Sequence, residues 1–178
     1  GAREVFPADI PAAEAATRTF KTVPADGFWS NPANWQEGIV PVNGDDVVFP
    51  AASSQLVVVN TIPNLQVRSI SLGNHVVVDG QPFSIGEGSV TWKGIATINV
   101  PVTLTADQTW TSTTDSLTLS LTGGVALNGH TVTFEAAPLS GNVQISGVVS
   151  GSGALIVNNG NLGLAGANTY AGQTIING

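Results

Sequence analysis

The sequence predicts an all-β protein, because it consists of short apolar segments separated by turn residues and offers almost no segment of helical length. Leu117, Leu119 and Leu121 alternate with polar residues, which places their side chains on one face of a strand. Gly accounts for 21 of the 178 residues. Gly and Asn bound most of the apolar segments, since both adopt turn conformations with little strain.

Composition excludes several classes of function. Charged residues make up 10% of the chain, against roughly 25% in ordinary soluble domains, so Asn, Thr, Ser and Gln must supply the polar surface. The net charge of −7 argues against nucleic-acid binding, which needs a basic face. The absence of cysteine excludes a disulfide scaffold, a thiolate metal site and a thiol nucleophile. No apolar stretch is long enough to span a bilayer.

The chain divides into a leader and one domain. Residues 1–24 contain three prolines and a third of the charged side chains, and we expect a flexible N-terminal leader rather than a packed element. Ala12–Ala16 is the one place where a short helix is expected. Residues 25–178 are expected to form a single β domain. The sequence opens with neither Met nor a signal peptide, so we expect a fragment of a longer protein.

Residues 25–49 are predicted to close one end of that domain. They contain Trp29 and Trp35 in a turn-rich stretch that ends in the first strand, Val47–Phe49. The pattern is similar to the segment that opens many large β-helical surface proteins. Two tryptophans near the end of a solenoid can cover its open apolar cross-section, which would otherwise expose strand edges and core. The alternative is that Trp29 and Trp35 bind ligand, as a platform on which sugars stack. Asp45 and Asp46 follow a glycine and are expected to form a turn rather than a Ca²⁺ site.

Residues 151–178 carry the most specific pattern. The run from Gly166 to Gly172 reads GANTYAG and is followed by the strand TII. It resembles the autotransporter-associated β-strand repeat of large secreted, β-helical proteins. The resemblance implies a right-handed parallel β-helix, or β-solenoid, in which Gly166, Asn168, Tyr170 and Gly172 are structural motif residues. We expect Asn168 to hydrogen-bond turn backbone, and the ring of Tyr170 to lie against the coil beneath it.

Internal similarity also favours stacked coils. The segments 72–78 and 127–133 share a leucine, a Gly/Asn turn, a histidine and a β run, so His75 and His130 are expected at equivalent turns. A β-sandwich or jelly roll is the alternative fold, and Asn128–Gly129 would suit its hairpins. With the repeat resemblance, we favour the solenoid, with six or seven coils of about 20 to 25 residues.

No catalytic constellation is visible. Neither histidine belongs to a recognisable metal or nucleophile motif. The acidic side chains between Asp79 and Glu135 are scattered singly along the sequence. Arg68 and Lys93 are the only lysine or arginine residues after residue 21. The glycine-rich strings 86–88 and 151–153 lack the strand-to-helix context of a phosphate loop and are expected to be tight corners. We therefore expect no metal and no cofactor.

The resemblance implies a non-enzymatic role. It suggests a stalk and an export or folding element within an adhesin-like passenger, secreted or held at the outer-membrane surface of a bacterium. The expected partners are the rest of a larger parent chain and host or environmental glycans or proteins. A carbohydrate-active or glycan-binding β-helix is the alternative function.

Overall fold

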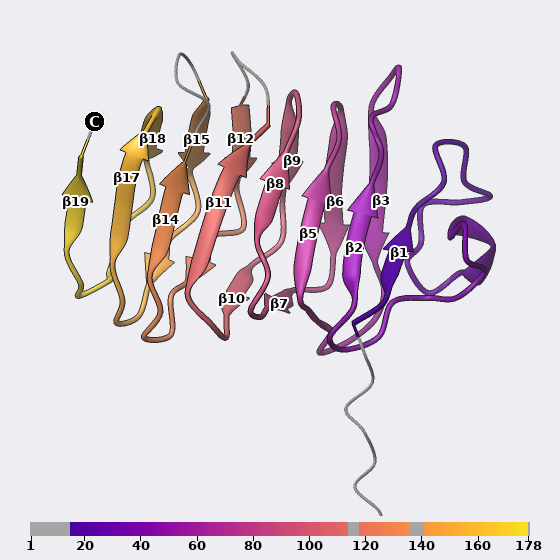
Figure 1. The fold of residues 1–178 in the computed structure, drawn as a ribbon, viewed down its shortest axis with the longest axis horizontal. Helices are drawn as coiled ribbons and strands as arrows, with labels where there is room; N and C mark the ends of the chain where they lie inside the picture. Colours follow the sequence, from indigo (N-terminus) through magenta and orange to yellow (C-terminus); the bar gives the residue numbers. More distant parts are fainter. Residues whose placement is uncertain (1–14, 114–117, 136–140, 178) are drawn as a thin grey trace, which may run out of the picture.

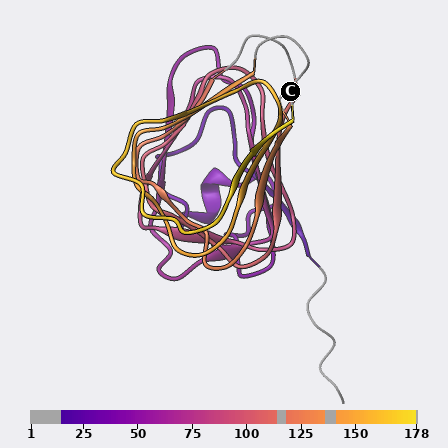
Figure 2. The ribbon, with the colours of Figure 1, turned by 90° about the vertical axis from the view of Figure 1, so that its left-hand side faces the viewer.

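The computed structural model describes residues 15–113, 118–135 and 141–177 and shows a parallel β-solenoid. Its strands stand side by side along the long axis (Figure 1), and the view along that axis superposes the coils on one closed outline (Figure 2). All pairings between the named strands are parallel. The predicted parallel β-helix is confirmed, and the alternative sandwich, which needs antiparallel hairpins, is wrong.

The strands form three sheets, one along each side of the solenoid. The first sheet has the order β1 (Thr17–Thr19), β2 (Asp46–Phe49), β5 (Ser69–Leu72), β8 (Val90–Trp92), β11 (Gln108–Ser112), β14 (Val132–Glu135), β17 (Leu155–Asn159) and β19 (Thr174–Ile176). The second contains β3 (Leu56–Asn60), β6 (Val76–Gly80), β9 (Ala96–Ile98), β12 (Thr118–Leu121), β15 (Asn142–Ile145) and β18 (Asn161–Leu164). The third contains β4 (Gln66–Val67), β7 (Phe83–Ile85), β10 (Val102–Leu104), β13 (Val125–Ala126) and β16 (Val149–Ser150).

One strand from each sheet makes a coil, and the coils match the predicted number, with spacings of 19 to 24 residues against the predicted 20 to 25. Five complete coils run from β2 to β16, the sixth contains β17 and β18, and β19 opens a seventh. Leu155 pairs with Thr174, 19 positions later, and Trp110 pairs with Phe134, 24 positions later. At the usual spacing of about 4.8 Å between strands, the stack is roughly 30 Å long.

The core is a set of apolar columns, because alternate residues of every strand point inward and pair in register with their counterparts one coil away. One column in the first sheet runs through six coils, and its members are nearly or fully buried: Val47, Ile70, Val90, Trp110, Phe134 and Val157. Ile176 of β19 extends this column but is 74% exposed, since no strand follows it in the described residues.

The predicted flexible leader is wrong for the residues that the structure describes before residue 25. Thr17–Thr19 form β1, which pairs with β2, and Phe20 is fully buried beneath the first coil. The N–H of Phe20 donates to the carbonyl of Val48 (2.8 Å). These residues are packed because β2 would otherwise expose its edge and the core behind it. Residues 1–14, with most of the expected helix, lie outside the described residues.

Two isoleucines of the same column provide a test of coil stacking. We expect Ile70→Ala to lower the free energy of unfolding by about 2 to 5 kcal/mol, because it empties a buried site between two coils. Ile176→Ala removes the same atoms from a largely exposed side chain and should change it by about 0.5 kcal/mol or less. Urea denaturation of both variants measures the difference. Equal losses would contradict the stacked-column geometry.

Candidate functional site

The N-terminal end of the solenoid is closed by an aromatic cap built from residues 20–35. Trp29 and Trp35 are fully buried, lie edge to face (6.3 Å between ring centroids), and pack with Phe20 and Phe49. The short helix of the cap, η1 (Pro32–Asn34), lies within the outline of the coils in Figure 2 and at the end near β1 in Figure 1. The two tryptophans therefore cover the first coil. Neither ring exposes a face to a sugar, so this burial favours the cap over the stacking platform.

A polar network fixes the shape of the cap. The carboxylate of Asp26 accepts hydrogen bonds from the N–H of Phe28 (2.9 Å) and from the side-chain amides of Asn34 (2.6 Å) and Asn31 (2.7 Å). The buried Asn34 also donates to the carbonyl of Phe28 (2.8 Å) and accepts from the N–H groups of Ala25 and Asp26. These bonds lower the pKa of Asp26, chiefly through the Phe28 N–H and then through Asn34 and Asn31.

Sequence reasoning did not find this network. A signal was present, because Asn31 precedes a proline in the arrangement of a helix N-cap, and it does accept from the N–H of Ala33 (3.0 Å). The sequence did not indicate that Asp26 and Asn34 would meet across the turn. The burial of the tryptophans could be expected from their size, whereas the short polar side chains around them form the hydrogen bonds that position the rings.

The adjacent aspartates Asp45 and Asp46 are each engaged by protein groups. Asp45 is nearly buried; it pairs with Arg18 (Nε–Oδ2 2.7 Å) and accepts from the N–H of Val42 (3.0 Å). Asp46 pairs with Arg68 and with the hydroxyl of Ser69 in the next coil. The pair thus attaches the first coil to β1 on one side and to the second coil on the other. No group of three or more metal-ligating side chains gathers in the part of the chain that the structure describes.

The two histidines are not equivalent, which corrects the prediction made from their similar flanking sequences. His75 precedes β6 at the corner between the first and second sheets, and its ring contacts the carbonyl of Ala52 (3.1 Å). His130 precedes β14 at the corner between the third and first sheets, beside Asp107 (3.6 Å). A similar turn sequence thus serves two different corners, and Asn128–Gly129 leads the chain from the third sheet to the first instead of forming a hairpin.

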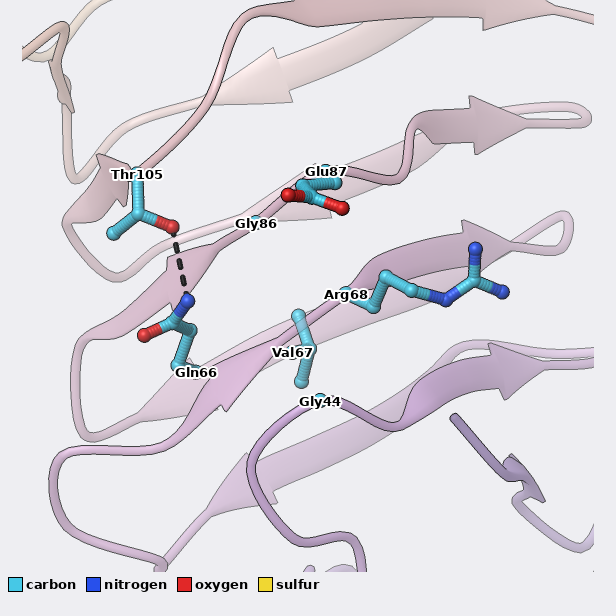
Figure 3. Close-up of a pocket in the computed structure, with 7 residues that line it drawn as sticks. All are labelled: Gly44, Gln66, Val67, Arg68, Gly86, Glu87 and Thr105. Atoms are coloured by element: carbon cyan, nitrogen blue, oxygen red, sulfur yellow. Dashed lines mark hydrogen bonds between the residues drawn. The ribbon is translucent and has the colours of Figure 1, made fainter. Parts of the chain in front are cut away.

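A shallow hollow of about 260 Å³ lies over the corner between the third and first sheets of the first coils (Figure 3). Gln66 donates to the hydroxyl of Thr105 (3.1 Å) across it, and Arg68 extends away from that pair towards its partner Asp46. Gly86 and the exposed Glu87 form the adjoining corner, as the sequence predicted for residues 86–88. Arg68 is the one cation among the lining residues, and it is paired with Asp46. Glu87 is the one carboxylate among them, so the lining contains no pair of acids.

In the C-terminal repeat, the side chain of Asn168 bonds the backbone of the preceding coil and not, as predicted, that of its own turn. Its side-chain oxygen accepts from the N–H of Val149 in β16 (2.8 Å), and the N–H of Thr169 donates to the carbonyl of Val149 (2.9 Å). Asn168 therefore continues the third sheet where the sixth coil has no strand. The ring of Tyr170 packs against the core beneath it, and its hydroxyl contacts that of Thr174 (2.5 Å).

The glycines of the repeat are required by close approach between coils. A Cβ atom at Gly166 would collide with the carbonyl oxygen of Gly147, and one at Gly172 would collide with that of Gly153. Both collisions are with backbone of the preceding coil, which cannot move without breaking the register of the stack. The glycines of the repeat are therefore needed for one coil to pack closely on the preceding one.

The chain matches no family model, no curated protein and no solved structure. None of the helices that the structure describes has the length and apolar character of a membrane span. The resemblance of residues 166–178 to the autotransporter-associated repeat therefore stays an expectation from the sequence.

The two cap tryptophans should respond differently to loss of their indole N–H. The indole of Trp35 donates to the carbonyl of Trp29 (2.8 Å), whereas the buried indole N–H of Trp29 has no partner among the described residues. We expect Trp35→Phe to be about 1 to 2 kcal/mol more destabilising than Trp29→Phe, since it also leaves a buried carbonyl unpaired. Thermal or urea unfolding measures both, and an equal or reversed order would contradict the hydrogen-bond assignment.

The cap should loosen in acid. Because the folded pKa of Asp26 lies below its ordinary value of 3.8, its stabilising contribution is present above about pH 3.8 and is lost as the pH falls through the folded pKa. Asp26→Asn should remove this contribution, so the stability difference between wild type and variant should shrink as the pH drops below 4. Denaturation curves from about pH 6 to pH 2.5 measure it. A difference that stays constant would show that Asp26 does not act through its charge.

Proposed function

We propose that this chain is a non-enzymatic structural segment of a bacterial surface-displayed protein of the adhesin or autotransporter kind. In this proposal it acts as a stalk and as an element that folds during export. The observation that carries the proposal is the solenoid itself: its coils stack in parallel register, and a dedicated aromatic cap closes the N-terminal end.

The energetics of a solenoid suit such a role. Each coil contacts chiefly its two neighbours, so stability accumulates coil by coil and folding can propagate from a closed end. A segment that crosses an outer membrane as an extended chain can fold progressively if each new coil docks on the one before it. The GANTYAG repeat supports the proposal because its glycines permit close stacking and Asn168 substitutes for a missing strand.

The surface chemistry is consistent with a spacer. The outward positions of the three sheets are mostly Ser, Thr, Asn and Gln, and the described carboxylates at the coils' edges mostly have local partners. The candidate hollow near Arg68 is shallow, with its cation paired to Asp46. A carbohydrate-active or glycan-binding role has no comparable supporting observation and serves as the outcome that would displace the proposal.

Surface display tests the proposal. The chain is placed between an N-terminal reporter domain and a C-terminal outer-membrane translocator, and the reporter at the cell surface is measured by protease accessibility. We expect the wild-type chain and Ile95→Asn to support display, because Ile95 is 56% exposed. Ile70→Asn, which places a polar group in the core, should lower display severalfold and expose the solenoid to proteolysis.

Two results would contradict this function. Equal display by Ile70→Asn and Ile95→Asn would mean that coil stacking plays no part in export. Cleavage or saturable binding of an acidic polysaccharide by the purified chain, with display unaffected by either substitution, would move the assignment to a carbohydrate-active protein.

A further inference from the structure

The outer face of the second sheet is apolar in its first coils and polar in the later ones. Val57 and Val59 of β3 and Val77 of β6 point outward, and Val57 is 41% exposed. We call these three residues the valine face. The outward residues of β9, β12 and β15 are Thr97, Thr118, Ser120, Asn142 and Gln144. Outward valines are typical of a sheet that another layer covers, because a solvated face normally carries polar side chains.

Further exposed apolar side chains border the valine face. Phe28 bridges to Val59 and is 48% exposed, and Ile95, which precedes β9, is 56% exposed. A shallow hollow of about 140 Å³ is lined by Val77, Ile95 and His75, so these side chains share one surface. Exposed apolar patches of this kind mark interaction sites.

Two side chains of opposite character flank the valine face at equal distances from Val77. The exposed His75 lies two positions before Val77 and Asp79 lies two positions after it, each about 7 Å away along the strand. Oδ1 of Asp79 accepts from the amide of Asn99 (2.8 Å), whereas Oδ2 has no partner among the described residues. His75 and Asp79 are about 13 Å apart along one strand, too far to pair with each other.

The arrangement is self-complementary. A two-fold axis parallel to the solenoid axis can pass over Val57 and Val77, which pair in register. Rotation about it lays each strand antiparallel over its copy, so each valine meets itself and His75 of either copy faces Asp79 of the other. An axis along the strands would instead oppose His75 with His75 and Asp79 with Asp79. Charge complementarity therefore selects the first axis.

We propose that the valine face docks a second copy of this chain through this two-fold contact, with a His75–Asp79 pair on each side of the valines. The contact does not depend on the proposed stalk function. Its axis keeps both caps at the same end, as in two stalks displayed from one surface. Few apolar side chains meet, so the contact belongs to the weak, transient class of interfaces, and display side by side would raise its occupancy.

Sedimentation equilibrium of the full chain between about 10 μM and 1 mM measures the pairing. We expect a monomer–dimer equilibrium that is stronger at about pH 5.5 than at about pH 8, because histidine side chains have an ordinary pKa of about 6.5. The described segments packed against His75 carry one other charged side chain, Lys93, two positions before Ile95. Lys93 is kept in every variant, so it does not affect their comparison.

A charge exchange tests the geometry. His75→Asp opposes two carboxylates and Asp79→His opposes two imidazoles, so each should weaken association at least about fivefold. The double variant restores both pairs with the partners exchanged and should return to within about twofold of the wild type. Position 75 tolerates the change, because its φ of 66° suits Asp as well as His. His130→Asp, the same substitution at the other turn histidine, is the matched control and should have no effect.

Val77→Thr tests the apolar part of the contact. Thr97 occupies the paired outward position one coil later, so the fold accepts threonine there. We expect this variant to weaken association about threefold or more, because it replaces a methyl group at the axis by a hydroxyl. Thermal unfolding of every variant checks that a loss of association is not a loss of folding.

Three outcomes would overturn the inference, and each leaves the stalk function standing. The first is a chain that stays monomeric at about 1 mM and about pH 5.5. The second is a dimer that His75→Asp, Asp79→His and Val77→Thr all leave unchanged, which would place the contact on another surface. The third is a folded double variant that associates no better than the single variants, which would contradict the two-fold geometry.

Discussion

The structure depends on in-register parallel pairing between coils. Each coil is too short to bury its own apolar side chains, so every inward residue is buried by the residues directly before and after it in its column. Ile70 and Ile176 show the consequence, since the same side chain in the same column is 1% exposed between two coils and 74% exposed where the column ends. Side chains inside the stack are therefore buried from both sides, whereas those at an end need a cap or a further neighbour to be buried.

The two ends meet this constraint differently. At the N-terminal end, the buried tryptophans cover the core, and Asp26 with its asparagine partners holds the turns that carry them. In the sixth coil, Asn168 and Thr169 continue the third sheet without a strand. Aromatic rings and a closed polar network thus cover the core at the N-terminal end, whereas an asparagine side chain takes over the pairing where the sixth coil lacks a strand.

A solenoid also disperses polar chemistry. Its outward residues belong to three faces, and residues meet only within a column or at a corner, so a catalytic cluster needs matching positions in successive coils. In the described residues these columns contain ladders instead: Asp79 begins one and Glu135 another, and each carboxylate is consumed by an amide of the following coil. The outer surface therefore stabilises stacking, and in both of these ladders the later coil donates to the earlier one.

The sequence by itself determined the strands, the corners and the cap, because these features are local. Alternation predicts that the side chains of Leu119 and Leu121 face inward, and the collisions at Gly166 and Gly172 explain glycines that the repeat pattern had already singled out.

Only the tertiary structure decided the rest. Residues 17–19 form a strand because their partner β2 lies across the cap, and no local pattern specifies a partner so distant in sequence. His75 and His130 occupy different corners because the 55 positions between them amount to more than two and fewer than three coils of 19 to 24 residues, so a turn sequence defines a turn without defining its place in the coil. The direction of the ladders likewise appears only once the register places Glu135, Asn158 and Asn177 in one column, since hydrogen-bond polarity belongs to the contacts between coils and not to any one of them.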